Sequence, residues 1–304
     1  MIRKDFPALR EHYFEETLEN GLVVRVVPRP GFAKKFAFLA ADFGSIDMRF
    51  SFDGRNYAVP AGVAHYLEHK MFDLPEGNAM EIYAKYGGSN NAFTNYTMTA
   101  YYVECTDCFE ENLQTLLRMV MTPYFTDESV EKERGIIEQE IRMYEDSAGS
   151  ACFENLFAAM YGSHPARIPI CGTVESIAEI TPETLYACHK AFYDPANMML
   201  CVVGDVDPER VAELARQHTP KGTKKRAVRD YGAQEPMTCP QPVVRRQMEV
   251  SMPTFAIGFK CLPASGGAEA ERLELIGDLA AELLTGESSA LYQRLYEQGV
   301  IHGD

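Results

Sequence analysis

The sequence predicts an α+β protein in which helices pack on a mixed, largely antiparallel sheet. The chain opens with alternating apolar and polar residues, which are typical of antiparallel strands. Later segments repeat apolar residues at the 3.6-residue spacing of helices. With 304 residues, 46% of them hydrophobic, the chain is long and apolar enough for about two domains with buried cores.

The first hundred residues predict strands, two helices and a further strand. The Asn20-Gly21 turn favours a hairpin between the first two alternating segments. Behind Pro60, which a helix tolerates in its first turn, apolar residues recur at helical spacing. The predicted strands are 13–18, 22–27, 35–43 and 92–103, and the predicted helices are 60–72 and 78–86.

The middle of the chain is predicted to contain five helices and one buried strand. The longest periodic segment is 127–146, in which Val130, Ile137 and Ile141 fall at helical spacing. The apolar run 198–203 predicts a strand that is buried on both faces. The other predicted helices are 109–121, 153–161, 182–193 and 208–217.

Residues 219–242 are predicted to form a linker, because they combine Pro and Gly with a basic cluster between two periodic segments. They separate a domain over 1–218 from a second unit over 243–304. In that unit, paired strands are predicted at 243–262 and an amphipathic helix at 269–284. We expect the second unit to be the N-terminal part of a truncated α+β domain.

The balance of charged and apolar residues limits the partners and the location of the protein. Lys and Arg number 29 against 44 Asp and Glu, giving a net charge of −15, which opposes binding to nucleic-acid phosphates. The N-terminal residues lack the apolar core of a signal peptide, and no stretch reaches the roughly 18 apolar residues of a membrane span. We therefore expect a cytoplasmic protein with no nucleic-acid or membrane partner.

The string His65-Tyr66-Leu67-Glu68-His69 lies on the helix predicted at 60–72. Residues at i and i+4 share a helix face, so His65 and His69 can offer two imidazoles to one metal ion. Glu68 lies beside them, within reach of a metal-bound water, and zinc is the ion that these ligands favour. The alternative is that all three side chains are simply exposed on the helix.

A catalytic zinc needs a third protein ligand and an open position for water. The stripe of helix 127–146 that carries its apolar residues comprises Glu133, Ile136, Ile137, Glu140, Ile141 and Tyr144. Because buried carboxylates are costly unless they are paired or metal-bound, Glu140 is a better candidate than Glu138, which has Arg142 four residues on. The alternative is that Glu133 and Glu140 cap the helix or pair with Arg134 or a lysine.

With these residues the chain resembles the pitrilysin/insulinase family of zinc metallopeptidases, the inverzincins, whose motif is H-x-x-E-H. The family places its third zinc ligand at the end of an E-R-x-x-x-x-x-E string, which Glu133-Arg134 through Glu140 matches here. The segment 65–72 is most similar to the bacterial YmfH-like branch. Further matching passages are 88–94 running into 101–102, 169–173, 193–197 and 204–205.

The resemblance implies a half-domain like those of mitochondrial processing peptidase and insulinase, with two related halves enclosing a substrate chamber. Residues 1–218 would be the zinc-binding catalytic half. One Zn²⁺ per chain would be held by His65, His69 and Glu140, with Glu68 as the catalytic general base. Glu133 would be a second catalytic acidic residue, which orients a metal ligand.

The resemblance also implies where a substrate binds. The strand that holds Asn91, Ala92, Phe93 and Thr94 would be the edge onto which an extended peptide adds by backbone hydrogen bonds. Arginine and tyrosine contacts from the second half would lie beyond Asp304.

We therefore expect a zinc-dependent metalloendopeptidase that hydrolyses a peptide or small protein bound as an extended strand. One alternative is a non-catalytic or partner-dependent subunit of the same family, in a homodimer or in a heterodimer with a paralogous member. The intact ligand set argues against pure scaffolding. The other alternative is a cytoplasmic binding module without metal, against which the inward-facing Glu133 and Glu140 argue.

Overall fold

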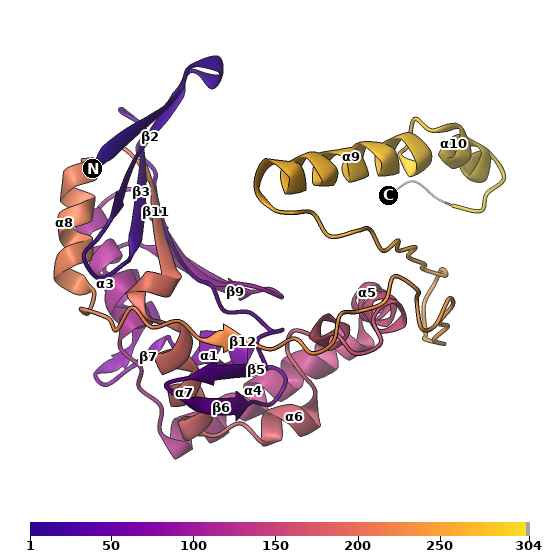
Figure 1. Ribbon diagram of the computed structural model, residues 1–304, viewed down its shortest axis with the longest axis horizontal. Helices are drawn as coiled ribbons and strands as arrows, with labels where there is room; N and C mark the ends of the chain where they lie inside the picture. Colours follow the sequence, from indigo (N-terminus) through magenta and orange to yellow (C-terminus); the bar gives the residue numbers. More distant parts are fainter. Residues whose placement is uncertain (302–304) are drawn as a thin grey trace. The chain divides into compact units, whose positions relative to one another are not determined.

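A seven-stranded mixed sheet dominates the computed structural model, which describes residues 1–301 (Figure 1). The strand order is β1-β2-β3-β11-β4-β10-β9. Strand β11 runs parallel to β3, and the other pairings in this sheet are antiparallel, which confirms the predicted fold class. The strands are Ile2–Phe6 (β1), Glu11–Thr17 (β2), Val23–Pro28 (β3), Lys35–Ala41 (β4), Ser89–Thr94 (β9), Thr99–Cys105 (β10) and Met198–Gly204 (β11).

Helices cover one face of this sheet and form the core with it. Helices α3 and α8 pack on β3, β4 and β10, and α1 packs on β9, β10, α4 and α7. Val24, Leu39 and Tyr101 point into this core, whereas Phe38 and Tyr102 lie half-buried on the opposite face. The helices are Val63–Lys70 (α1), Ala79–Lys85 (α2), Phe109–Met121 (α3), Asp127–Asp146 (α4), Ala148–Met160 (α5), Val174–Ala178 (α6), Pro182–Phe192 (α7) and Pro208–His218 (α8).

Two smaller sheets lie outside the large one. A three-stranded sheet has the order β12-β5-β6, and the pair β7-β8 follows α1 along the chain. These short strands are Arg49–Phe52 (β5), Arg55–Ala58 (β6), Asp73–Leu74 (β7), Gly77–Asn78 (β8) and Val228–Arg229 (β12). Strand β12 therefore ties part of the predicted 219–242 linker to the first hundred residues.

Helix α4 follows from its N-terminal sequence and its apolar stripe. The Thr126 hydroxyl accepts a hydrogen bond from the Ser129 N–H at 3.1 Å, and the Ser129 hydroxyl accepts one from the Thr126 N–H at 3.2 Å. Val130 and Ile137 are buried in the core. The Tyr66 hydroxyl donates to the Val130 carbonyl, so α4 is joined to α1.

The strand predicted over 92–103 is wrong as a single element, because the structure forms a hairpin of β9 and β10 there. The Asn95 side-chain oxygen accepts hydrogen bonds from the N–H groups of Thr97 and Met98, and this turn chemistry interrupts the apolar run. The hairpin places β9 at the edge of the sheet.

Two predicted helices begin at the wrong residue. Helix α1 begins at Val63 rather than Pro60, because Gly62 takes a left-handed conformation with φ of 87° at the N-cap. Helix α5 begins at Ala148 rather than near 153, because the Ser147 side chain caps it by accepting from the Ser150 N–H.

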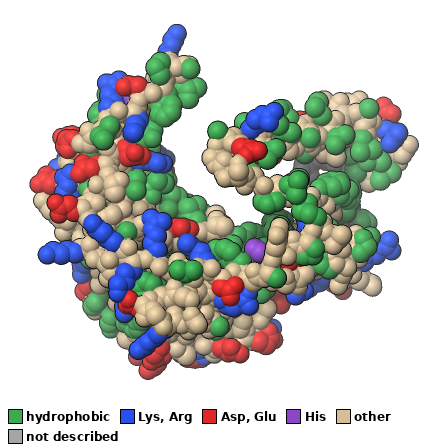
Figure 2. Space-filling view, viewed as in Figure 1, with side chains coloured by type: hydrophobic (Ala, Val, Ile, Leu, Met, Phe, Trp, Pro, Cys, Tyr) green, Lys and Arg blue, Asp and Glu red, His purple; other side chains and the backbone are tan. Residues whose placement is uncertain are grey.

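The chain divides into two units, Met1–Gly258 and a second that begins at Phe259. The paired strands predicted over 243–262 are wrong, since these residues form no strand. The predicted helix over 269–284 is confirmed as α9, Gly267–Thr285, and is followed by α10, Ala290–Glu297. Apolar side chains lie on the surface of α9 (Figure 2). Leu275, Leu279 and Leu283 of this helix are exposed. The last three residues of the predicted 243–304 unit lie outside the described part.

Within residues 1–301, none of the helices combines the length and the apolar character that crossing a membrane would require.

Candidate metal centre

Helix α1 brings the two histidines and Glu68 to one place. The ring centroids of His65 and His69 lie 4.6 Å apart, as expected for residues one helical turn from each other. His65 and Glu68 are each only 7% exposed. The surface-exposed arrangement that the sequence left open is therefore wrong for these two residues.

Glu140 of α4 lies between the two imidazoles. Its Oε2 atom is 3.6 Å from His65 Nε2 and 3.5 Å from His69 Nε2. Nitrogen and oxygen ligands about 2.0 Å from a tetrahedral zinc ion are about 3.3 Å apart, so these separations nearly match a zinc site. The adjacent His65 imidazole holds the pKa of the Glu140 carboxyl below its usual value.

Three other residues of α4 lie away from the two imidazoles. Glu138 accepts a hydrogen bond from Arg142 at 2.6 Å on the exposed side, as predicted. Arg134 pairs with Glu131, so the alternative in which it pairs with Glu133 or Glu140 is not what the structure shows. The predicted apolar stripe is wrong at Ile136, which is 47% exposed.

Glu133, on α4, forms a hydrogen bond with the imidazole of His69, on α1. Its Oε1 atom lies 3.0 Å from His69 Nδ1, which leaves Nε2 of the same ring facing Glu140. Burial alone would lower the pKa of His69, but the Glu133 hydrogen bond and the charges of Glu68, Glu133 and Glu140 outweigh it, so the pKa is raised. The carboxylate thus fixes which ring nitrogen is free to bind a metal.

Glu68 is held by a residue that the sequence placed in the substrate strand. The Thr94 hydroxyl of β9 donates to Glu68 Oε2 at 2.6 Å, so this side chain faces the acid. Burial raises the pKa of the Glu68 carboxyl, and the Thr94 hydrogen bond partly offsets the rise. A carboxylate whose pKa is raised by burial is a stronger base than an exposed one.

The other predicted substrate residues lie along the edge strand beside this acid. Asn91 and Ala92 of β9 line a groove of about 580 Å³ that also contacts Glu68, His69 and Glu133. The Asn91 side chain accepts a hydrogen bond from the Ala92 N–H. Phe93 is 38% exposed and does not line the groove; its ring lies 6.2 Å from that of Phe38.

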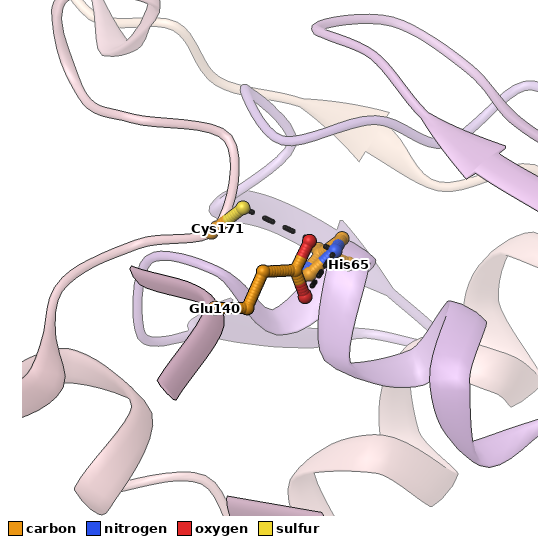
Figure 3. A group of neighbouring side chains, drawn as sticks. All are labelled: His65, Glu140 and Cys171. Atoms are coloured by element: carbon orange, nitrogen blue, oxygen red, sulfur yellow. Dashed lines mark hydrogen bonds and ion pairs between the residues drawn. The ribbon is translucent and has the colours of Figure 1, made fainter. Parts of the chain in front are cut away.

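The structure adds a residue that spacing along the sequence does not reveal. Figure 3 shows the Cys171 side chain directed toward His65 and Glu140, and its Sγ atom lies 3.9 Å from His65 Nε2. Burial raises the pKa of this thiol to about 12. Its membership of the matching passage 169–173 was the only sequence signal at this position.

The donor set fits a zinc ion. Two neutral imidazole nitrogens and one carboxylate oxygen are a ligand combination that catalytic zinc sites use. The half-buried Glu140 carboxylate faces two imidazoles, and a cation between the three groups would balance its charge.

Comparison with known proteins identifies the family of this chain. Residues 55–174 match the family profile described as "Insulinase (Peptidase family M16)", and residues 179–303 match that described as "Peptidase M16 inactive domain". The chain is 41% identical over 304 residues to a protein named as an uncharacterized zinc protease, YmfH, of Bacillus subtilis. The match covers 98% of this chain and 71% of YmfH.

The chain belongs to the insulinase family. Within it, the similarity places the chain in the YmfH-like branch, as the segment 65–72 predicted. The first of the two profiles spans His65, Glu68, His69, Glu140 and Cys171. The chain covers a smaller part of other relatives, for example 37% of the zinc protease ML0855 of Mycobacterium leprae, to which it is 34% identical over 166 residues.

Solved structures of other proteases share the fold. A putative M16-like peptidase from Alicyclobacillus acidocaldarius superposes with a TM-score of 0.87 at 34% identity, over 98% of this chain and 70% of that one. The ferredoxin protease FusC, solved in complex with Arabidopsis ferredoxin, superposes with a TM-score of 0.64 at 27% identity. That match covers 75% of this chain and 26% of the FusC chain.

Proposed function

We propose that this chain contains the catalytic half of a zinc-dependent metalloendopeptidase. The observation that carries the proposal is the placement of Glu140 Oε2 within 3.6 Å of His65 Nε2 and 3.5 Å of His69 Nε2, beside the buried acid Glu68. The first two would hold the ion through Nε2 and Glu140 through a carboxylate oxygen, one ion per chain. Names given to relatives, such as the zinc protease YmfH, support the same activity.

The chemistry divides between the ion and the protein. Zinc in such a site polarises a peptide carbonyl and lowers the pKa of a bound water. Glu68 takes the proton from the attacking water and passes it to the leaving amine. Thr94 holds Glu68 Oε2, so Oε1 is the oxygen free to carry the proton. Glu133 keeps the His69 ring in the orientation that the site needs.

We propose that the substrate is a peptide or protein segment added as an extended strand to β9. The position of β9 at the sheet edge supports this, because its outer backbone groups are not used within the seven-stranded sheet. The groove beside β9 leads to Glu68 and His69. The structural neighbour FusC, solved in complex with ferredoxin, is a case of a protease with a similar fold that binds a protein.

We also propose that residues 1–218 form the catalytic domain, that 219–242 link it to a second domain, and that the latter begins at 243. The structure divides into two units after Gly258, which is slightly later in the chain than the proposed start at residue 243. Hydrogen bonds from the N–H groups of 162–164 to Glu235 support a linker that is anchored to the first domain.

The test compares the 304-residue chain with its Glu68→Gln variant. Zinc content is measured by metal analysis, and cleavage is measured on a mixture of peptides. We expect one zinc per chain in both proteins and cleavage only in the parent, since Gln cannot accept the proton. Cleavage by Glu68→Gln at the parental rate would reject Glu68 as the base.

The same experiment separates the alternatives. Zinc bound by a parent that cleaves nothing, even when a paralogous family member is added, would favour a non-catalytic subunit. Cleavage that begins only with that second chain would indicate a partner-dependent enzyme. A parent that binds no zinc would indicate a metal-free binding module.

A further inference from the structure

Cys171 lies in the segment that joins α5 to α6 and directs its thiol at the candidate metal centre (Figure 3). Its Sγ atom, His65 Nε2 and a Glu140 carboxylate oxygen all lie within 4.8 Å of one another. The three groups come from separate parts of the chain. This cluster is therefore built by the tertiary fold and not by local sequence.

The separations within the cluster are those of a common coordination sphere. A zinc–sulfur bond of about 2.3 Å and a zinc–nitrogen bond of about 2.0 Å place tetrahedral S and N ligands about 3.5 Å apart. Cys171 Sγ is 3.9 Å from His65 Nε2, and Glu140 Oε2 is 3.6 Å from the same nitrogen. Both separations from His65 Nε2 lie within about half an ångström of the expected values.

The His65 ring presents one of its two nitrogens to this cluster. His65 is only 7% exposed, and its Nδ1 atom is buried without a hydrogen-bond partner among residues 1–301. The polar contacts of this ring are therefore made by Nε2, which faces Glu140 and Cys171. An ion bound at Nε2 would therefore lie next to both of these groups.

Backbone packing fixes Cys171 in place. A Cβ atom on Gly62, the N-cap of α1, would lie 2.4 Å from the Cys171 carbonyl oxygen. A Cβ atom on Gly172 would lie 2.5 Å from the Ala61 carbonyl oxygen. The Ser176 hydroxyl also donates to Ala61 O at 2.9 Å. These close contacts hold the cysteine backbone against the start of the helix that carries His65.

We propose that Cys171 is a fourth protein ligand of the metal, which closes the site while no substrate is bound. The inference rests on the proposed zinc site of His65, His69 and Glu140. As the metal–sulfur bond forms, the thiol loses its proton to solvent, so one proton is released and no group is oxidised or reduced. The position that an attacking water requires is then occupied by sulfur, and the resting enzyme is latent.

The test uses Co²⁺ in place of zinc, because a thiolate bound to Co²⁺ gives a near-ultraviolet charge-transfer band that nitrogen and oxygen ligands do not give. We expect this band in the parent chain and its loss in Cys171→Ala, with Co²⁺ still bound through the other three ligands. Cys201→Ala is the matched control, because Cys201 is a partly buried cysteine of β11. This variant is expected to leave the band unchanged.

Zinc affinity gives a second readout. We expect Cys171→Ala to weaken zinc binding by about tenfold in a chelator competition, and zinc to protect Cys171 from alkylation by iodoacetamide. Co²⁺ bound by the parent without the band would overturn the Cys171 proposal and leave the proposed function intact. No Co²⁺ or Zn²⁺ bound by the parent would instead reject the metal site itself.

Discussion

Glu138 and Glu140 lie two residues apart on α4 in opposite surroundings. Glu140 contacts both imidazoles, whereas Glu138 pairs with the exposed Arg142. We expect Glu140→Gln to weaken zinc affinity at least about tenfold, because a neutral amide replaces a charged ligand. Glu138→Gln is expected to leave the affinity unchanged. Chelator competition measures both, and an equal loss in the two variants would contradict this assignment of helix faces.

The Thr94 hydroxyl acts on Glu68 and not only on the substrate strand. Its hydrogen bond to a buried carboxylate is of the charge-assisted kind, so its loss should cost about 1.5 kcal/mol or more. We expect Thr94→Val to lower kcat about tenfold at unchanged zinc content. Thr94→Ser retains the hydroxyl and should keep most of the activity. A Ser variant as impaired as Val would show that the methyl group, and not the hydrogen bond, is what matters.

The sequence predicted those site residues that are related by a regular spacing along the chain. His65, Glu68 and His69 share one helical turn, and Glu140 was found from its place on the apolar stripe of helix 127–146 and then matched by the family pattern. The contacts of Cys171 and of the Thr94 hydroxyl could not be predicted. Cys171 is 106 residues from His65 along the chain, and Thr94 is 26 residues from Glu68. No periodicity within these segments predicts such contacts.

The junction between α1 and the 170–172 segment depends on glycine. Gly62 has φ of 87°, and an added Cβ would lie 2.4 Å from the Cys171 carbonyl oxygen. Gly31 is a matched control, since its φ is 82° and an added Cβ would meet nothing within 4 Å. We expect Gly31→Ala to lower the free energy of unfolding by about 1 kcal/mol, from backbone strain alone.

Gly62→Ala should lower the free energy of unfolding by clearly more than Gly31→Ala, because the carbonyl contact must also be relieved. It should also weaken zinc binding, since the start of the helix that carries His65 has to move. Urea unfolding and zinc titration measure the two effects. Equal losses of stability in the two variants would show that the junction tolerates a side chain.

Long helices were predicted well and isolated strands less well, for a physical reason. The segments 109–121 and 127–146 satisfy their backbone hydrogen bonds internally, so local periodicity predicts α3 and α4 with their bounds. A strand needs a partner elsewhere. The alternating residues at 243–262 find no such partner and form no strand, whereas β12 and β5 pair across more than 170 residues.

Across the whole molecule, one buried histidine links stability to pH. His189 of α7 lies in the core, with its Nε2 atom 3.0 Å from the Val120 carbonyl and its ring stacked on Tyr193. Burial lowers the pKa of His189 to about 4, against 6.5 for a histidine exposed to solvent. Between these values the unfolded chain binds a proton that the folded chain does not, so this contribution is complete above pH 6.5 and is lost as the pH falls toward 4.

We expect the free energy of unfolding of the metal-free chain to decrease between pH 7 and pH 4, with His189 accounting for up to about 3 kcal/mol of the fall. His189→Gln should be less stable at pH 7, because the Tyr193 stacking is lost, yet its stability should decrease less steeply with acid. The slope therefore isolates the proton linkage from the packing defect. Urea unfolding in EDTA at several pH values measures this slope. Parallel slopes for parent and variant would mean that His189 has the same pKa in the folded and the unfolded chain.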